Sequence, residues 1–199
     1  MLRSIEDLKN IQEKSRGLLF LRKNVEAVSE KRELLVCAGT GCHSAMSKEI
    51  MENFNEELEK RNLTDKATCH ITGCFGFCEK GPIVKVYPDD VFYTEVTVDD
   101  IDEIISEHIV QGNMVERLLY VDPKTKKKID TQHHMDFYGK QERIALRNCG
   151  LIDPEKIEEY IANDGYTALA DILMNKQPID VVDVLKESGL RGRGGGGFP

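Results

Sequence analysis

Apolar positions follow two different periods along this chain, and these periods predict its strands and helices. Short apolar or alternating runs predict four strands, at residues 33–36, 67–71, 83–87 and 91–93. Apolar residues three and four positions apart predict helices at 44–60 and 98–111. The capping-box sequence Ser4-Ile5-Glu6-Asp7 predicts an earlier helix that ends near Gly17. From residue 33 the order is strand, helix, strand, strand, strand, helix, which predicts an α/β sandwich.

The second half of the chain has a different pattern. Residues 112–135 contain a short apolar stretch followed by a polar, turn-rich segment, and we interpret them as a linker. Beyond this linker, helical spacing predicts helices at 137–147, 154–161, 166–174 and 179–187. The predicted parts are therefore an N-terminal helical extension at 1–32, an α/β domain at 33–111, the linker at 112–135 and a small helical segment at 136–199.

Four cysteines lie in two close pairs, and each pair follows a predicted strand. Cys37 and Cys42 have the spacing C-x₄-C, Cys74 and Cys78 have the spacing C-x₃-C, and 31 residues separate the two pairs. Such pairs suit a [2Fe-2S] cluster, which needs two thiolates per iron. Neighbouring glycines let the backbone turn sharply and leave amide N–H groups free to hydrogen-bond the cluster sulfurs. These glycines are Gly39, Gly41, Gly73 and Gly76.

The spacing of the cysteines leaves other kinds of site open. A zinc site with four cysteine ligands is the main alternative, because zinc accepts many thiolate spacings, although zinc ribbons usually have two C-x₂-C pairs. A thioredoxin-type redox pair needs C-x-x-C, which the sequence lacks. A disulfide framework is typical of secreted proteins, and we expect no secretory leader here. We expect Cys69 and Cys149 to be small buried residues and the adjacent His133 and His134 to be solvated.

The two cysteine motifs resemble a known module. Residues 37–42, CAGTGC, and residues 72–82, TGCFGFCEKGP, resemble the thioredoxin-like [2Fe-2S] ferredoxin module of the 24-kDa-type subunit of respiratory complex I. The same module is fused to the flavin subunit of electron-bifurcating [FeFe] hydrogenases and related NAD(P)-linked enzymes. This resemblance implies a thioredoxin-like [2Fe-2S] ferredoxin sandwich in which Cys37, Cys42, Cys74 and Cys78 hold the cluster.

Composition and charge narrow the classes of function. The chain has 199 residues, of which 40% are hydrophobic, enough for one or two ordinary cores. Its net charge of −8 argues against a nucleic-acid-binding surface, which normally needs a basic patch. No apolar run approaches the length that spans a bilayer. We therefore expect a cytoplasmic protein with no membrane span and no nucleic-acid partner.

A glycine-rich stretch closes the sequence. Successive glycine N–H groups can form an anion-binding nest, and arginines beside them add positive charge, so this stretch suits a phosphate or pyrophosphate group. A flexible tail or linker fits the same composition equally well. The candidate cofactor-binding residues are Gly192, Arg193, Gly194, Gly195, Gly196 and Gly197.

The end of the chain resembles a second family. Residues 147–169 and 188–199 resemble the entry to the flavoprotein subunit of complex I and of its hydrogenase relatives, where the glycine-rich loop lines the FMN and NAD(H) pocket. This resemblance implies that the helical segment leads into a complex I flavoprotein-like domain. A ferredoxin module followed by this entry is the order found in the flavin-bearing beta subunit of an electron-bifurcating [FeFe] hydrogenase.

This second resemblance implies a larger enzyme. It implies an NAD(P)H-linked oxidoreductase subunit with FMN, NAD(H) and downstream [4Fe-4S] clusters, so we expect residues 1–199 to be a fragment with no catalytic residues and no diaphorase activity of its own. The implied partners are NAD(P)H, ferredoxin, a hydrogenase catalytic subunit and a complex I 24-kDa-like [2Fe-2S] subunit. A formate dehydrogenase or complex I relative has the same order of modules. A zinc-stabilised interaction domain is the non-redox alternative.

Overall fold

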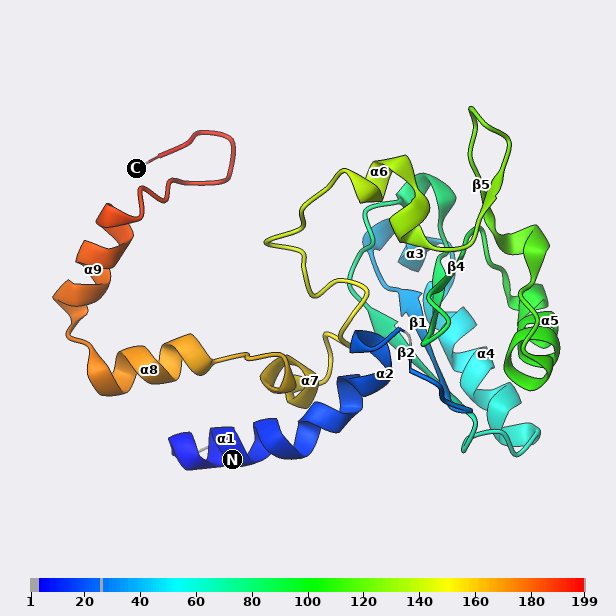
Figure 1. The fold of residues 1–199 in the computed structure, drawn as a ribbon, viewed down its shortest axis with the longest axis horizontal. Coiled ribbons are helices and arrows are strands. Elements are labelled where there is room, and N and C mark those ends of the chain that lie inside the picture. Colours follow the sequence, from blue (N-terminus) through cyan, green and yellow to red (C-terminus); the bar gives the residue numbers. More distant parts are fainter. Residues whose placement is uncertain (1–3, 26, 199) are drawn as a thin grey trace.

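A four-stranded sheet lies at the centre of the fold (Figure 1). The computed structural model describes residues 4–25 and 27–198. The strand order is β2-β1-β3-β4, and β1 runs parallel to β2 and antiparallel to β3, which in turn is antiparallel to β4. The strands are β1 (Arg32–Cys37), β2 (Ala67–Thr72), β3 (Val84–Tyr87) and β4 (Val91–Tyr93). All four predicted strands are confirmed to within one residue at each end.

Two helices cover one face of the sheet and enclose the main core. α4 (Ser47–Lys60) connects β1 to β2 and buries Ile50, Phe54 and Leu58, as its apolar spacing predicts. The second helix follows β4 and consists of the 3₁₀ turn Val98–Asp100, α5 (Ile101–Glu103) and a π-helical stretch, Ile104–Gln111. The helix predicted from residue 44 differs in one respect, because a separate short helix, α3 (Thr40–Ser44), precedes α4.

Segments from both halves of the chain meet over the other face of the sheet (Figure 1). α1 (Ile5–Ser15) begins with the predicted capping box, and the 3₁₀ turn Arg16–Leu19 joins it to α2 (Phe20–Lys23), which packs on β1. α7 (Ile157–Ala162) packs against α1 and the 3₁₀ turn. A small separate core of Leu19, Ile152 and Ala162 holds these segments together.

Residues 112–135, interpreted from the sequence as a linker, are structured and pack on the sheet. They contain the 3₁₀ turn Glu116–Leu118, the strands β5 (Tyr120–Val121) and β6 (Lys128–Ile129), and the 3₁₀ turn Gln132–His134. Val115, Leu118 and Leu119 belong to the main core. The backbone amide of Phe92 on β4 donates a hydrogen bond to the carbonyl of Asp130, at 2.7 Å. Burial of these three apolar side chains explains why this stretch packs against the sheet and does not extend into solvent.

The helix predicted at 137–147 is wrong. Only α6 (Asp136–Gly139) forms there, and residues 140–156 are turns and irregular backbone. The Tyr138 hydroxyl donates to the Phe75 carbonyl at 2.9 Å, and Arg143 donates to the Cys74 carbonyl at 3.2 Å. These contacts hold the segment against the sheet unit, and such tertiary contacts routinely override local helix propensity.

The last two helices extend away from the sheet (Figure 1). α8 (Thr167–Asn175) and α9 (Pro178–Glu187) confirm the helices predicted at 166–174 and 179–187, whereas the helix predicted from Pro154 begins only at Ile157. Across residues 4–25 and 27–198, every helix is too short or too polar to span a bilayer.

Candidate metal centre

The two cysteine loops lie at the same edge of the sheet. β1 ends at Cys37 and β2 ends at Thr72, and the register of the two strands pairs these residues with each other. Because the strands are parallel, the chain leaves both of them at one edge. The first loop carries Cys42 on α3, and the second carries Cys74 and Cys78. The two loops therefore meet at one end of the sheet, as the position of each cysteine pair directly after a predicted strand implies.

The four cysteine sulfurs lie in contacting pairs. The Sγ atoms of Cys74 and Cys78 are 4.0 Å apart, and the Cys42 thiol donates a hydrogen bond to Cys37, which also contacts Cys74. Two thiolates on one tetrahedral metal, with bonds of about 2.3 Å, lie about 3.8 Å apart. Paired thiolates are the donor set that a two-iron cluster uses.

Burial differs between the two pairs. Cys37 and Cys42 are each 1% exposed, whereas Cys74 is half-buried and Cys78 is exposed. The buried pair belongs to a second core, whose other members are Phe75, Ile83, Phe92, Met135 and Tyr138. One side of the site is thus closed by apolar side chains, and the other side faces solvent.

Backbone amides point at the cysteine sulfurs. The donors are the N–H groups of Gly39 and Phe75 to Cys37, of Ile83 to Cys42, and of Gly76 to Cys74, the last at 3.2 Å. The hydrogen bond from Cys42 and these amides lower the pKa of Cys37 to about 6, against the effect of burial. The hydrogen bond to Cys37, followed by burial, raises the pKa of Cys42. Hydrogen bonds to sulfur stabilise the thiolate form that binds metal.

At two positions the backbone passes so close to a cysteine sulfur that only glycine fits. A Cβ atom added to Gly39 would lie 2.9 Å from the Cys74 Sγ, and one added to Gly81 would lie 2.5 Å from the Cys42 Sγ. Any larger residue at either position would push a sulfur aside. The paired thiolates, the N–H donors and these glycines fit a [2Fe-2S] cluster. The sequence pattern does not single out Gly81 as part of the site, although it is the glycine just before Pro82 in the second motif.

Aromatic rings cover the second loop. Phe75 is 1% exposed and meets Phe92 edge to face at 5.2 Å between ring centroids. Phe77 stacks on Phe137 at 5.8 Å and 21° between planes, and Phe137 is exposed. Phe75 therefore closes the interior side of the site, while Phe77 and Phe137 line its outer rim.

The two remaining cysteines and the adjacent histidines lie outside the group of four. Cys69 is 2% exposed in the main core, and burial raises the pKa of its thiol, which agrees with its expected role as a small apolar residue. Cys149 is only half-buried, and its Sγ lies against Gly73 of the second loop. His133 and His134 are exposed, as predicted, with Asp90 and Asp130 as their respective neighbours.

Comparisons with known proteins agree with this geometry. The family model described as "Thioredoxin-like [2Fe-2S] ferredoxin" matches residues 22–108. The 2Fe-2S ferredoxin of Clostridium pasteurianum is 43% identical over 99 residues, which make up 46% of this chain and 97% of that protein. The chain belongs to the thioredoxin-like [2Fe-2S] ferredoxin family. The ferredoxin unit contains the sheet, α4, the α5 helix and both cysteine loops, and its mixed α/β fold is the predicted one.

Two larger proteins are also similar to part of the chain. The NADP-reducing hydrogenase subunit HndC of Solidesulfovibrio fructosivorans is 63% identical over 60 residues, which are 30% of this chain and 12% of that protein. The F 2 subunit of the NADH-quinone oxidoreductase from Rhizobium meliloti (strain 1021) is 45% identical over 58 residues, which are 29% of this chain and 14% of that protein. The chain spans only a small part of either relative.

The glycine-rich stretch lies far from the ferredoxin unit, beyond α9 (Figure 1). Gly195 and Gly197 have positive φ angles of 91° and 60°, and the Gly192 amide donates to the Phe198 carbonyl at 2.6 Å, which closes a loop. Residues 191–196 are exposed. The structure thus brings the four cysteines together and leaves the glycine-rich candidates in a separate, open loop.

Proposed function

We propose that Cys37, Cys42, Cys74 and Cys78 hold a [2Fe-2S] cluster and that this unit is a one-electron carrier. The convergence of two thiolate pairs at the ends of the parallel strands β1 and β2 is the observation that carries this assignment. A bound [2Fe-2S] cluster supplies reversible uptake of a single electron.

The residues of the chain have separate tasks in this function. The amides of Gly39, Phe75, Ile83 and Gly76 hydrogen-bond the sulfurs, which favours the more negative, reduced state and raises the potential. The second core keeps water from the buried pair of cysteines. The exposed Cys78 and the rim of Phe77 and Phe137 leave one side accessible, so electrons enter or leave there.

We further propose that the chain is the N-terminal part of a flavin-bearing, NAD(P)H-linked oxidoreductase subunit in a cytoplasmic complex. The similarity to HndC supports a hydrogenase context. Bound FMN would supply hydride exchange with NAD(P)H there, and this unit would pass single electrons on towards further [4Fe-4S] clusters. The partners would be ferredoxin, a hydrogenase catalytic subunit and a complex I 24-kDa-like subunit, and electron bifurcation belongs to this same proposal. The similarity to the NADH-quinone oxidoreductase protein supports a complex I relative as the second candidate.

The glycine-rich loop has a proposed role in the complete subunit. Gly192, Arg193 and residues 194–197 would bind the phosphate of FMN or the pyrophosphate of NAD(H). The positive φ angles of Gly195 and Gly197 support this role, because alternating backbone conformations turn successive N–H groups towards an anion.

Serine replacement of each ligand tests the cluster assignment. Cys37→Ser, Cys42→Ser, Cys74→Ser and Cys78→Ser should each lower the iron content, the visible absorbance and the electron paramagnetic resonance signal of the reduced protein. Cys69→Ser is the matched control and should keep all three, since Cys69 lies in the main core. A colourless wild-type protein that binds zinc stoichiometrically, or a ligand variant that retains the full signal, would refute the assignment.

A further inference from the structure

The turn formed by residues 148–152 sits on the ferredoxin sheet through three buried hydrogen bonds. The Tyr87 hydroxyl donates to the Gly150 carbonyl at 2.7 Å. The Thr72 hydroxyl accepts from the Gly150 amide at 2.9 Å and donates to the Ile152 carbonyl at 2.8 Å. Thr72 is the last residue of β2 and lies two positions before the ligand Cys74. The turn is therefore bonded to the strand end that carries the second cysteine loop.

The same turn packs directly against that loop. A Cβ atom added to Gly150 would lie 2.4 Å from the ring of Phe75, and Gly150 has a φ of 84°. A Cβ atom added to Gly73 would lie 2.8 Å from the Sγ of Cys149. Phe75 and Gly73 flank Cys74, so the turn supports the second loop on both sides of its first ligand.

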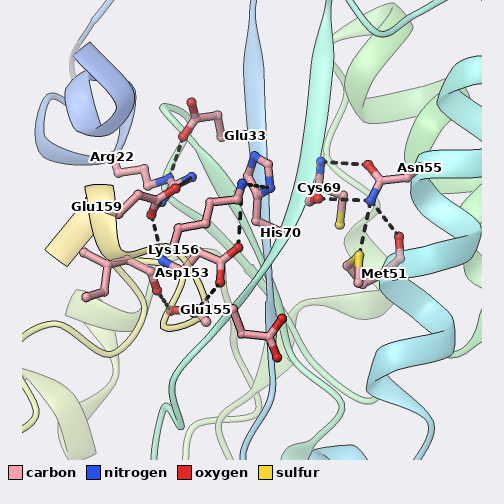
Figure 2. A network of polar contacts seen from close by, with 12 residues as sticks. Arg22, Glu33, Met51, Asn55, Cys69, His70, Asp153, Glu155, Lys156 and Glu159 are labelled. Carbon is pink, nitrogen blue, oxygen red and sulfur yellow. Dashed lines mark hydrogen bonds and ion pairs between the residues drawn. The ribbon is translucent and has the colours of Figure 1, made fainter. Parts of the chain in front are cut away.

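A buried network of ion pairs around Arg22 also holds the turn (Figure 2). The Arg22 guanidinium bonds Glu33 on β1 and Glu159 on α7, both at 2.5 Å, and also donates to the Leu151 carbonyl at 3.1 Å. Nearby, Lys156 donates to His70 Nδ1 on β2 at 3.0 Å. Arg22 thus joins the backbone of the turn to β1, and Thr72 joins it to β2.

Phe75 transmits the position of the turn to the cysteine sulfurs. Its amide donates to the Cys37 sulfur, and its carbonyl accepts from the Tyr138 hydroxyl at 2.9 Å. The amide of the next residue, Gly76, donates to the Cys74 sulfur at 3.2 Å. A shift of the Phe75 ring would lengthen N–H···S bonds to two of the four ligands, and such bonds tune the reduction potential.

We propose that residues 148–152 position the second cysteine loop and thereby set the reduction potential of the cluster, with Gly150 and Thr72 as positioning residues. This role rests on the cluster binding proposed above. It assigns a redox-tuning task to a segment outside the residues 22–108 that the family model covers. The turn acts through Phe75, because Gly150 lies directly against the ring of that residue.

Two glycine variants test the role of the turn. Gly150→Ala places a methyl group against the Phe75 ring, whereas Gly112→Ala is a matched control, because Gly112 has a φ of 77° and open space around its Cβ position. Both variants strain the backbone alike, and only the first touches the loop. We expect Gly150→Ala to shift the midpoint potential to more negative values and to change the g-values of the reduced protein, and Gly112→Ala to change neither.

Two further measurements keep the test decisive if Gly150→Ala folds poorly. Thr72→Val removes the hydroxyl that bonds the turn, and Thr72→Ser restores it, so the potential should shift in the valine variant and return in the serine variant. In the metal-free chain, amide hydrogen exchange at residues 75 and 76 should be faster in Gly150→Ala and Thr72→Val than in wild type.

The outcomes separate this role from cluster binding itself. A wild-type chain that assembles no cluster contradicts the proposed function, while the exchange measurement still reports on the turn. Unchanged potentials in both Gly150→Ala and Thr72→Val, equal shifts in Gly150→Ala and Gly112→Ala, or a shift to more positive values would each overturn the positioning role.

Discussion

Replacing Arg22 by methionine should detach α7 from the ferredoxin unit. The Arg22 side chain is 1% exposed, and Glu159, its partner on α7, is 2% exposed. The guanidinium is bonded to the carboxylates of Glu33 and Glu159 (Figure 2). It also donates to the Leu151 carbonyl. Methionine fills much of the space of the arginine side chain with apolar atoms. It leaves both carboxylates without their cation.

The magnitude follows from the burial of the partners. Breaking a buried ion pair by removing one partner costs about 3–5 kcal/mol, because the remaining charge stays desolvated. Glu33 is 13% exposed and can recover some hydration, so most of the loss should come from Glu159. Since about 1.4 kcal/mol is a factor of ten, opening of α7 should become about two to nearly four orders of magnitude more frequent.

Amide hydrogen exchange of residues 148–162 measures this opening directly. Urea unfolding of the metal-free chain, followed by circular dichroism, gives the accompanying loss of global stability. Arg61→Met is the matched control, because Arg61 pairs with Asp102, whose side chain is 77% exposed, and such surface pairs are worth about 1 kcal/mol or less. Arg22→Met combined with Glu159→Gln should recover part of the loss by removing the stranded charge.

A particular pattern of exchange would refute this reasoning. If Arg22→Met left the protection of residues 148–162 unchanged, or cost no more than Arg61→Met, the Arg22 network would contribute no more than an exposed pair. Faster exchange across the whole sheet, with no preference for the α7 region, would equally contradict the docking role.

Two further predictions concern the pH dependence of stability and the close packing of Gly39 against a cysteine sulfur. Burial, with the charge of Lys156 beside it, lowers the pKa of His70 from 6.5 to about 4, so the unfolded chain binds one more proton than the folded chain between these values. Stability should therefore fall as the pH drops from 6.5 to about 4, by about 1–2 kcal/mol after solvent screening, and His70→Gln should lose less in urea unfolding across that window. Gly39→Ala should lower the bound iron per chain, because its Cβ would collide with the sulfur of Cys74. Gly17→Ala is the control and should keep the wild-type iron content, because the space beside Gly17 is open. Equal iron contents in the two variants would contradict the requirement for glycine at position 39.

The sequence predicts the ferredoxin unit well because its elements are locally encoded. Strand runs, the α4 periodicity and the Ser4 capping box each depend on residues within a few positions of one another, and the structure has all of them. The meeting of the cysteine loops also follows from element order, since each pair comes directly after a strand. Neither inference needs a contact between distant segments.

The second half of the chain was harder to predict for a physical reason. Arg22 and Glu159 are separated by 137 residues, and no local pattern marks their contact. The helix expected at 137–147 has adequate spacing, but the bonds of Tyr138 and Arg143 to the second cysteine loop override it. The buried part of residues 112–135 is a short apolar stretch between polar turns, which in isolation is typical of a linker.

Because β1 and β2 pair in parallel, the number of residues between the two cysteine motifs can vary. The loops are neighbours because their strands are hydrogen-bonded side by side, and α4 merely returns the chain from one strand to the next. Lengthening or shortening that crossover, for example in the turns after Lys60, would leave the sulfurs where they are. Distant homologues should therefore be sought by the two short motifs separately, with the number of residues between them allowed to drift during evolution.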